Sequence, residues 1–220
     1  MTRWTQKNME ELLSVYFIMG STNCQDKNPV QVLEEAIEGG ITLFQYREKG
    51  PGALVGSEKR HLGENLQRVC RDANIPFIVN DDVDLAIDLD ADGIHVGQDD
   101  ANAREVRERI PGKLLGVSAH TVDEGKQAIA DGADYLGVGP IYQTKSKSDA
   151  KEAQGAEVIK RFRDQQITIP IVGIGGITTE NAHEVIQAGS NGVSVISAIA
   201  NAPNVRSAAA KFKEITILTE

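Results

Sequence analysis

The sequence lacks the features of secreted disulfide-rich, membrane-spanning and zinc-binding proteins. Only two of its 220 residues are cysteines, Cys24 and Cys70, and they form no Cys-x-x-Cys pair, which predicts neither a disulfide framework nor a zinc site. The apolar run nearest the N-terminus, Val15–Met19, follows two glutamates and is far too short to span a bilayer. We therefore expect a cytoplasmic protein with reduced thiols, no signal peptide and no membrane partner.

An excess of positive charge is also lacking. The formal net charge is -9, which argues against nucleic acid as a partner, because binding to a phosphate backbone depends on clustered Lys and Arg. Small anions can still bind where a few cations and backbone N–H groups converge locally. Hydrophobic residues at 40% and charged residues at 25% are ordinary globular values, and no linker divides the chain, so we expect residues 1–220 to form a single domain.

Short apolar, β-branched runs recur along the whole chain and predict strands. The eight runs are Val15–Met19, Thr42–Tyr46, Phe77–Asn80, Gly93–Val96, Leu114–Ser118, Tyr135–Val138, Ile171–Ile174 and Val193–Ile196. Most are continuously apolar, as in parallel strands buried on both faces, and helix-like segments that often end in glycine separate them. The Gly-x-Gly-x-x-Gly marker of a doubly wound open sheet is absent after the first run. The pattern predicts an α/β fold of the (β/α)₈ TIM-barrel type, with a short extra helix from Thr5 to Leu13.

In such barrels, binding and catalytic groups follow the carboxyl ends of the strands. After the second run stands Gln45-Tyr46-Arg47-Glu48-Lys49, which puts an amide and two cations at alternate positions as donors for a phosphate. Asn80-Asp81-Asp82 and Asp99-Asp100 follow the next two runs. Carboxylates from adjacent strands suggest Mg²⁺, and we assign Asp81 and Asp100 to it. Helix capping explains Asp82 and Asp99 equally well.

The later strand ends carry hydroxyls and glycines. Ser118 offers a hydrogen bond to a substrate oxygen, but no Gly-x-Ser-x-Gly elbow marks it as a nucleophile. The stretch from Ile141 to Gln154 is rich in hydroxyls and amines, and it either closes over an anion or stays solvated. Glycines in Gly173–Ile177 let backbone N–H groups approach a phosphate, although strand packing is an alternative for Gly173. We expect His95 to pack within its strand and His120 to neighbour a helix cap.

Seven motifs stand in order at these strand ends. They are Gln45-x-Arg47-x-Lys49, Asn80-Asp81, His95-x-Gly97-Gln98-x-Asp100, Gly116-Val117-Ser118, Gly139-Pro140-Ile141-Tyr142 with Thr144-Lys145-Ser146-Lys147, Gly173-Ile174-Gly175-Gly176-Ile177, and Ile196-Ser197. Over nearly the whole barrel the chain resembles the thiamine-phosphate synthase family. The resemblance implies a (β/α)₈ enzyme that joins 4-amino-2-methyl-5-(diphosphooxymethyl)pyrimidine to a thiazole phosphate and releases pyrophosphate.

The resemblance also implies roles for individual residues. Those that hold the pyrimidine diphosphate are Gln45, Arg47, Lys49, Asn80, Ser118 and Lys147, with Asp81 and Asp100 on Mg²⁺. Those that hold the thiazole phosphate are Thr144, Ser146, Gly176, Ile196 and Ser197. Tyr46, Glu48 and Lys145 lie inside the same motifs and are counted as substrate-binding, and the catalytic set is Arg47, Lys49, Ser118 and Lys147. Ser146 departs from the threonine common in the family but keeps the hydroxyl.

Two other functions remain open from the sequence. A thiazole tautomerase shares much of this barrel and its phosphate site but has no diphosphate to ionise, so it needs no magnesium carboxylates. A non-catalytic phosphate-binding barrel would keep the glycine loops and lose the metal and pyrophosphate groups. The set Arg47, Lys49, Asp81 and Asp100 favours the synthase. Whether the protein forms a homo-oligomer is left open.

Overall fold

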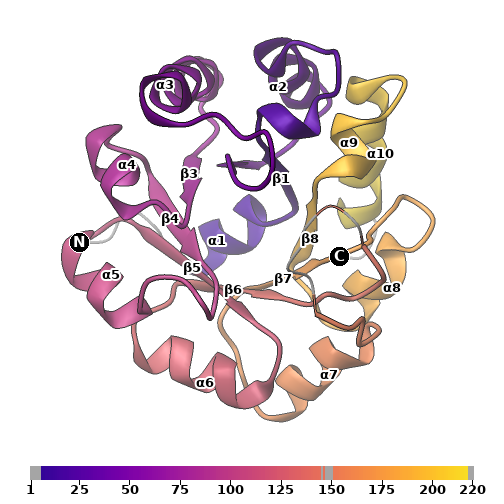
Figure 1. Cartoon of the computed structure of the whole chain (residues 1–220). Helices are drawn as coiled ribbons and strands as arrows, with labels where there is room; N and C mark the ends of the chain where they lie inside the picture. The colour runs from indigo at the N-terminus through magenta and orange to yellow at the C-terminus, as the bar shows by residue number, and fades with distance from the viewer. Residues whose placement is uncertain (1–5, 145, 147–150, 218–220) are drawn as a thin grey trace.

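The strands form a closed barrel with helices outside it. The computed structural model describes residues 6–144, 146 and 151–217. All strand pairs are parallel, in chain order from the first to the eighth, and the eighth closes the barrel on the first. Figure 1 looks along the barrel axis and shows helices surrounding the strands. The strands are β1 (Val15–Met19), β2 (Leu43–Tyr46), β3 (Phe77–Asn80), β4 (Gly93–Val96), β5 (Leu114–Ala119), β6 (Tyr135–Val138), β7 (Ile171–Ile174) and β8 (Gly192–Val195).

The helices alternate with the strands, and local signals fix where several of them begin. Asn28 accepts a hydrogen bond from Val30 N, and Pro29 occupies the first helical position of α2. Thr121 and Glu124 form a capping box at the start of α6. The helical segments are α1 (Gln6–Leu12), the 3₁₀ turn η1 (Ser21–Asn23), α2 (Pro29–Glu38), α3 (Gly56–Asp72), α4 (Val83–Asp88), α5 (Ala103–Arg109), α6 (Val122–Ala130), α7 (Glu157–Asp164), α8 (Ala182–Gln187), α9 (Ser197–Ala200) and α10 (Val205–Ile217).

The predicted TIM barrel and its extra N-terminal helix are confirmed. All eight predicted runs are strands, with shifts at their ends: β2 begins at Leu43, β5 continues to Ala119, and β8 starts and ends one residue earlier than predicted. The helix expected from Thr5 to Leu13 is α1. Within the residues that the structure describes, no helix is both long and apolar enough to cross a membrane. Cys24 and Cys70 are buried and are not joined in a disulfide.

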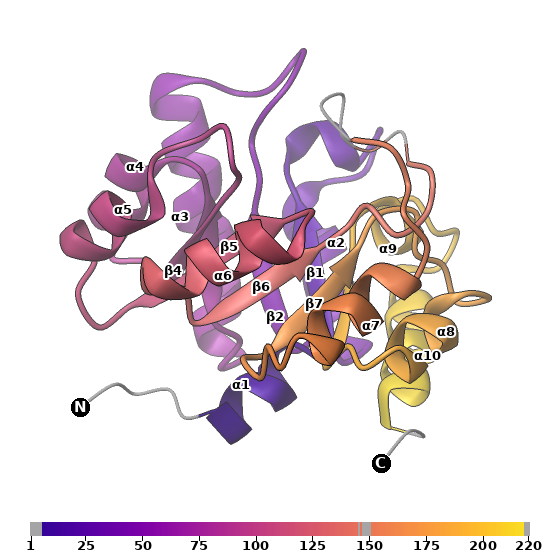
Figure 2. The same ribbon diagram turned by 90° about the horizontal axis from the view of Figure 1, so that it is seen from below.

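Two apolar clusters fill the molecule and leave one end of the barrel open. The larger cluster packs the outward faces of the strands against the helices. The smaller one fills the barrel interior, where Tyr16, Ile18 and Tyr135 meet Met9 and Leu13 from the N-terminal segment. Figure 2 shows α1 beneath one end of the barrel, with the β6–α7 loop at the other end. Since α1 covers the amino ends of the strands, their carboxyl ends are where a ligand can enter.

Candidate active site

A cavity of about 1180 Å³ lies over the carboxyl ends of the strands. Residues that follow every strand contribute to its lining, among them Asn23 after β1 and Asn80 at the end of β3. A volume of this size exceeds that of an ordinary single-ligand site of about 300–1,000 Å³. The cavity can therefore hold two small substrates side by side.

Two cations and two carboxylates form one side of the cavity, which we call the charged wall: Arg47, Lys49, Asp81 and Asp100. The Lys49 ammonium lies 2.6 Å from Asp81 Oδ2 and 3.2 Å from Asp100 Oδ1. The second oxygen of Asp100 accepts a hydrogen bond from Gly97 N at 2.9 Å. Three loops, after β2, β3 and β4, thus bring their charges to one point.

The backbone at Asp81 directs its carboxylate to that point. Asp81 has φ +60°, the left-handed region that non-glycine residues rarely adopt and that Asp tolerates better than most. Its N–H donates to His95 O at 2.9 Å, which continues the β3–β4 pairing by one step. Such conformations concentrate at functional sites. The turn places the Asp81 side chain beside Lys49.

The carboxylates of the charged wall titrate differently. Burial raises the pKa of Asp81, and the neighbouring Asp100 adds to this effect against the Lys49 ammonium. Burial also acts to raise the pKa of Asp100, but hydrogen bonds from Asp81, the Gly97 N–H and Lys49 outweigh it, so this pKa is lowered. Both carboxylates raise the pKa of Lys49 against the opposing effect of burial. Asp100 is thus the carboxylate best held in its charged form.

The donor set of the charged wall fits Mg²⁺. Two carboxylates already share one cation, and no group of three or more His, Cys, Asp or Glu side chains forms a closed metal cage among the described residues. Magnesium commonly uses one or two carboxylates and takes its other ligands from water and substrate phosphate, whereas structural zinc takes four protein ligands. Asp81 and Asp100 suit an ion that arrives with a phosphorylated substrate.

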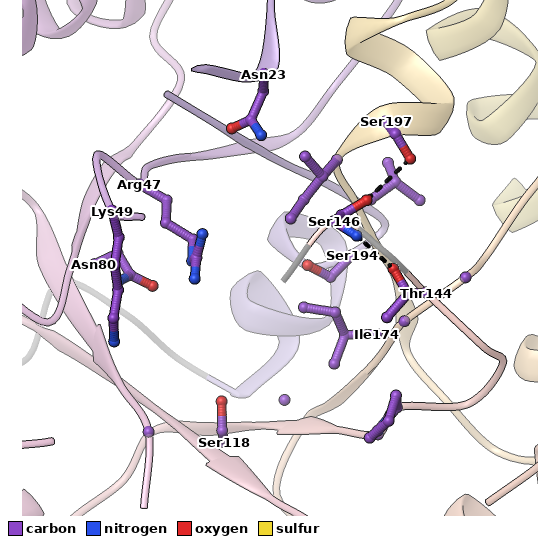
Figure 3. A pocket seen from close by; sticks show the side chains of 18 of the residues that line it. Asn23, Arg47, Lys49, Asn80, Ser118, Thr144, Ser146, Ile174, Ser194 and Ser197 are labelled. Atoms are coloured by element: carbon purple, nitrogen blue, oxygen red, sulfur yellow. Dashed lines mark hydrogen bonds between the residues drawn. The ribbon is translucent and has the colours of Figure 1, made fainter. Parts of the chain in front are cut away.

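The opposite side of the cavity carries hydroxyls and glycine, and we call it the neutral wall: Thr144, Ser146, Gly176 and Ser197. Ser146 Oγ donates to Ser197 Oγ at 3.1 Å, and Ser146 N donates to Thr144 Oγ1 at 3.2 Å. Ile196 lines the cavity beside them. Figure 3 shows the two sides facing each other, with Arg47, Lys49 and Asn80 on one and Thr144, Ser146, Ser194 and Ser197 on the other.

The glycines after β7 hold the β6–α7 loop in place. A Cβ on Gly176, whose φ is +62°, would lie 2.4 Å from Gln143 O, and one on Gly175 would lie 2.6 Å from Pro140 Cβ. The loop is joined to β7 by hydrogen bonds from Ile141 N and Tyr142 N. At Gly173 an added Cβ would lie 2.4 Å from Val185 Cγ1, so packing against α8 requires that glycine. The neutral wall is therefore built by close backbone packing.

Comparisons with known proteins identify the family. The sequence profile of the family described as thiamine monophosphate synthase matches residues 15–199. The chain belongs to the thiamine monophosphate synthase family. It is 61% identical over 214 residues to a thiamine-phosphate synthase of Geobacillus kaustophilus, covering 97% of this chain and 96% of that protein, and 56% identical over 214 residues to one of Bacillus cereus, covering 97% of each.

A solved structure agrees. The thiamine phosphate pyrophosphorylase of Pyrococcus furiosus superposes with a TM-score of 0.85 at 32% identity, covering 96% of this chain and 98% of that one. The predicted family, fold and enzyme class are thus confirmed. The protein is a transferase of thiamine biosynthesis.

Among the residues that the structure describes, most of those expected to bind substrate line the cavity, but three do not. Gln45 is buried in the barrel interior, where its Nε2 donates to the Tyr16 hydroxyl at 2.6 Å. Tyr46 points to the opposite face of β2 and donates its hydroxyl to Lys59 O at 2.9 Å. Glu48 accepts from Ser21 N and Leu54 N, both at 2.8 Å. Since side chains alternate along an extended chain, Tyr46 and Glu48 support the loops while Arg47 and Lys49 face the cavity.

A hydrogen-bonded chain beneath the cavity was not foreseen. The Tyr16 and Tyr135 hydroxyls lie 2.9 Å apart, and Tyr135 bonds to His95 Nδ1 at 3.2 Å. His95 Nε2 lies 2.9 Å from Ser118 Oγ. His95 is buried in its strand as expected, but it also lines the cavity. Because Gly116 and Gly137 have no side chain, the His95 ring fits between β4, β5 and β6.

Asp82 and His120 both lie at the starts of helices. Asp82 caps α4, as its side chain accepts from Leu85 N. His120 precedes the Thr121 cap, hydrogen-bonds Glu124 and lines the cavity. Lys145 and Lys147 lie outside the described residues. Lys151 of the same loop lines the cavity.

Proposed function

We propose that this synthase condenses 4-amino-2-methyl-5-(diphosphooxymethyl)pyrimidine with 4-methyl-5-(2-phosphooxyethyl)thiazole, giving thiamine phosphate and pyrophosphate, with Mg²⁺ as cofactor. The observation that carries the proposal is the convergence of the Asp81 and Asp100 carboxylates on the Lys49 ammonium, at 2.6 Å and 3.2 Å. Such a cluster suits a ligand with more negative charge than one phosphate, accompanied by a divalent cation. We also propose a cytoplasmic location, as suits its two reduced thiols.

The diphosphate belongs at the charged wall in this proposal. Arg47 and Lys49 supply donors to its oxygens, and Asp81 and Asp100 hold the metal. When bound there, Mg²⁺ would neutralise charge on the departing pyrophosphate. Ser118 Oγ, oriented by its contact with His95 Nε2, and the Asn80 amide add neutral hydrogen-bond donors at the same side.

The bond changes require no proton transfer. The bond between the methylene carbon and the diphosphate oxygen breaks, and its electron pair leaves with pyrophosphate. The electron-rich aminopyrimidine stabilises the methylene cation, and the lone pair of the thiazole nitrogen then forms the new C–N bond. That nitrogen carries no proton, so a general base is unnecessary. Catalysis rests on charge stabilisation, alignment of the two rings and exclusion of water.

The thiazole phosphate belongs at the neutral wall. Thr144, Ser146 and Ser197 supply hydroxyls, and Gly176 and Ile196 line the same side, where backbone N–H groups of the loops after strands seven and eight commonly bind phosphate. The resemblance implies that Lys147 binds the pyrimidine diphosphate, and Lys145 of the same motif is counted as substrate-binding. Two anions on opposite sides leave the rings to meet in the middle.

The test is release of pyrophosphate by the purified protein given both substrates or either alone, in Mg²⁺ and then in EDTA. We expect release only with both substrates and the metal. Folded protein that releases no pyrophosphate under any condition would contradict the proposal. Interconversion of thiazole phosphate isomers without metal would identify a tautomerase. Binding of the phosphates without turnover would identify a phosphate-binding barrel.

A further inference from the structure

Ser194 is a buried hydroxyl at the floor of the cavity with no hydrogen-bond partner. It lies on β8, is 3% exposed and lines the cavity. Of the buried side-chain nitrogen and oxygen atoms in the described part of the chain, Ser194 Oγ alone has no partner. Its register neighbours are Ile174 on β7 and Tyr16 on β1. Figure 3 shows its side chain next to Ile174, at the edge of the cavity.

Strand packing does not explain this hydroxyl. Buried polar groups in folded proteins nearly always have partners, and an unsatisfied one destabilises the protein that carries it. Ser190, four residues earlier, shows the ordinary case: its one hydroxyl proton is shared between Gly192 O at 2.6 Å and Ile171 O at 3.1 Å, and its oxygen accepts from Gly173 N at 3.0 Å. Ser190 stabilises the fold, whereas Ser194 lines the cavity, and Figure 3 shows its oxygen turned towards that space.

The surroundings of Ser194 indicate which kind of ligand atom its hydroxyl can bind. Arg47 and Lys49 lie across the cavity from it in Figure 3, and Ile174 beside it is apolar. Ser194 lies within β8, whereas Ser197 begins α9 beyond the carboxyl end of that strand, so Ser194 lies deeper in the barrel than the Ser197 hydroxyl. The register neighbours of Ser194 on β7 and β1 carry no charge, and a charged oxygen buried among uncharged groups would be destabilised. A neutral polar atom is the suitable partner.

We propose that Ser194 is a substrate-contacting residue whose hydroxyl bonds a ring nitrogen or amino group of a heteroaromatic substrate ring. This inference rests on the function proposed above, in which phosphates lie at the walls and rings between them. The thiazole has a single ring nitrogen, whose lone pair must stay free to form the new C–N bond, whereas the pyrimidine offers ring nitrogens and an amino group. The pyrimidine is therefore the ring that we assign to Ser194.

Binding to Ser194→Ala and to the matched Ser190→Ala should be measured by calorimetry with three probes: pyrophosphate with Mg²⁺, 4-amino-5-hydroxymethyl-2-methylpyrimidine, and the thiazole phosphate. We expect Ser194→Ala to weaken binding of the pyrimidine about three- to tenfold, the loss of a neutral hydrogen bond. The variant's affinities for pyrophosphate and for thiazole phosphate should stay unchanged. The melting temperature of Ser194→Ala should not fall, because no hydrogen-bond partner is lost. The melting temperature of Ser190→Ala should fall.

Three results would overturn the inference: weakening of pyrophosphate or thiazole phosphate as large as that of the pyrimidine, unchanged affinity for the pyrimidine, or a fall in melting temperature as large as that of Ser190→Ala. Pyrophosphate release by the unmodified protein is measured alongside. If that release fails, the proposed reaction is wrong, and the binding measurements still decide whether Ser194 contacts a ring.

Discussion

The charged wall and the neutral wall differ in what holds them in place. In the charged wall, long side chains meet in ion pairs, and the Lys49 side chain is 42% exposed. In the neutral wall, glycines with positive φ and backbone hydrogen bonds fix the β6–α7 loop against β7. One side of the cavity is positioned by side chains that can exchange partners. The other is positioned by the backbone itself.

This difference suits the two anions that we assign to them. An ion pair with an exposed member contributes little to stability, typically about 0–1 kcal/mol, so Lys49 can leave Asp81 and Asp100 at small cost when a metal and a diphosphate arrive. A monophosphate that stays attached throughout the reaction needs no such exchange. Rigid donors serve it better, because they are ordered before binding.

The largest expected effect comes from breaking the charged wall. Asp100→Ala removes the carboxylate best held in its charged form, and since even outer partners of metal ligands cost about 10–100-fold, we expect Mg²⁺-dependent pyrophosphate release to fall at least about 100-fold. The melting temperature should hardly change, because Asp100 is a loop residue. Asp99→Ala is the control and should retain its rate, because Asp99 is an exposed carboxylate that lines the same cavity but is not paired with Lys49. Equal losses in both variants would argue against a specific ligand at Asp100.

A substitution in the neutral wall should have a smaller effect. Gly176→Ala puts a Cβ 2.4 Å from Gln143 O, so the β6–α7 loop must shift, and we expect the affinity for thiazole phosphate to fall on the order of tenfold, about 1.4 kcal/mol. Affinity for pyrophosphate should stay unchanged. Calorimetry with each ligand measures both.

Gly155→Ala is the matched control for Gly176→Ala. Gly155 also has positive φ, +71°, but an added Cβ there meets nothing within 4 Å. It carries the backbone strain, about 1–3 kcal/mol, without displacing the loop. If Gly155→Ala weakened thiazole phosphate as much as Gly176→Ala, strain rather than packing at the neutral wall would account for the loss.

The charged wall could be predicted from the sequence more completely than the neutral wall. Parallel strands bring their carboxyl ends to one edge, so the approach of Asp81 to Asp100 followed once the strands were recognised. Tyr46 and Glu48 could have been excluded by the alternation of side chains that selects Arg47 and Lys49. Their membership in a contiguous motif obscured that alternation.

Other features depend on three-dimensional packing that one sequence does not encode locally. The partnerless hydroxyl of Ser194 sits in a run that reads as plain buried strand. The chain from Tyr16 through Tyr135 to His95 joins residues up to 119 positions apart. Gly176 has the expected position, but the loop that it contacts, rather than a ligand alone, is what requires glycine there.

The smallest expected effect is the loss of stability in Asp82→Ala, which is compared with a substitution of the adjacent Asp81. Asp82 accepts from Leu85 N and pairs with Lys59 at 2.7 Å, so Asp82→Ala should lower stability by about 1 kcal/mol, the cost of a lost cap, or roughly 2–4 °C in melting temperature. Pyrophosphate release should not change. Asp81→Asn should do the reverse: the melting temperature should stay nearly constant, because Asn also tolerates the left-handed backbone at this position, and metal-dependent release should be lost.

The stability effect at Asp82 should also depend on pH. Burial acts to raise the pKa of Asp82, but the Lys59 ammonium and the Leu85 N–H outweigh it and hold the pKa below its ordinary value. A carboxyl whose pKa is lower in the folded state stabilises the protein above its unfolded pKa of about 3.9, and this contribution is lost as the pH falls through the folded pKa. The difference in melting temperature between Asp82→Ala and the unmodified protein should therefore shrink between pH 5 and the acid limit of folding. A difference that stays constant on acidification would assign the effect to packing instead of charge.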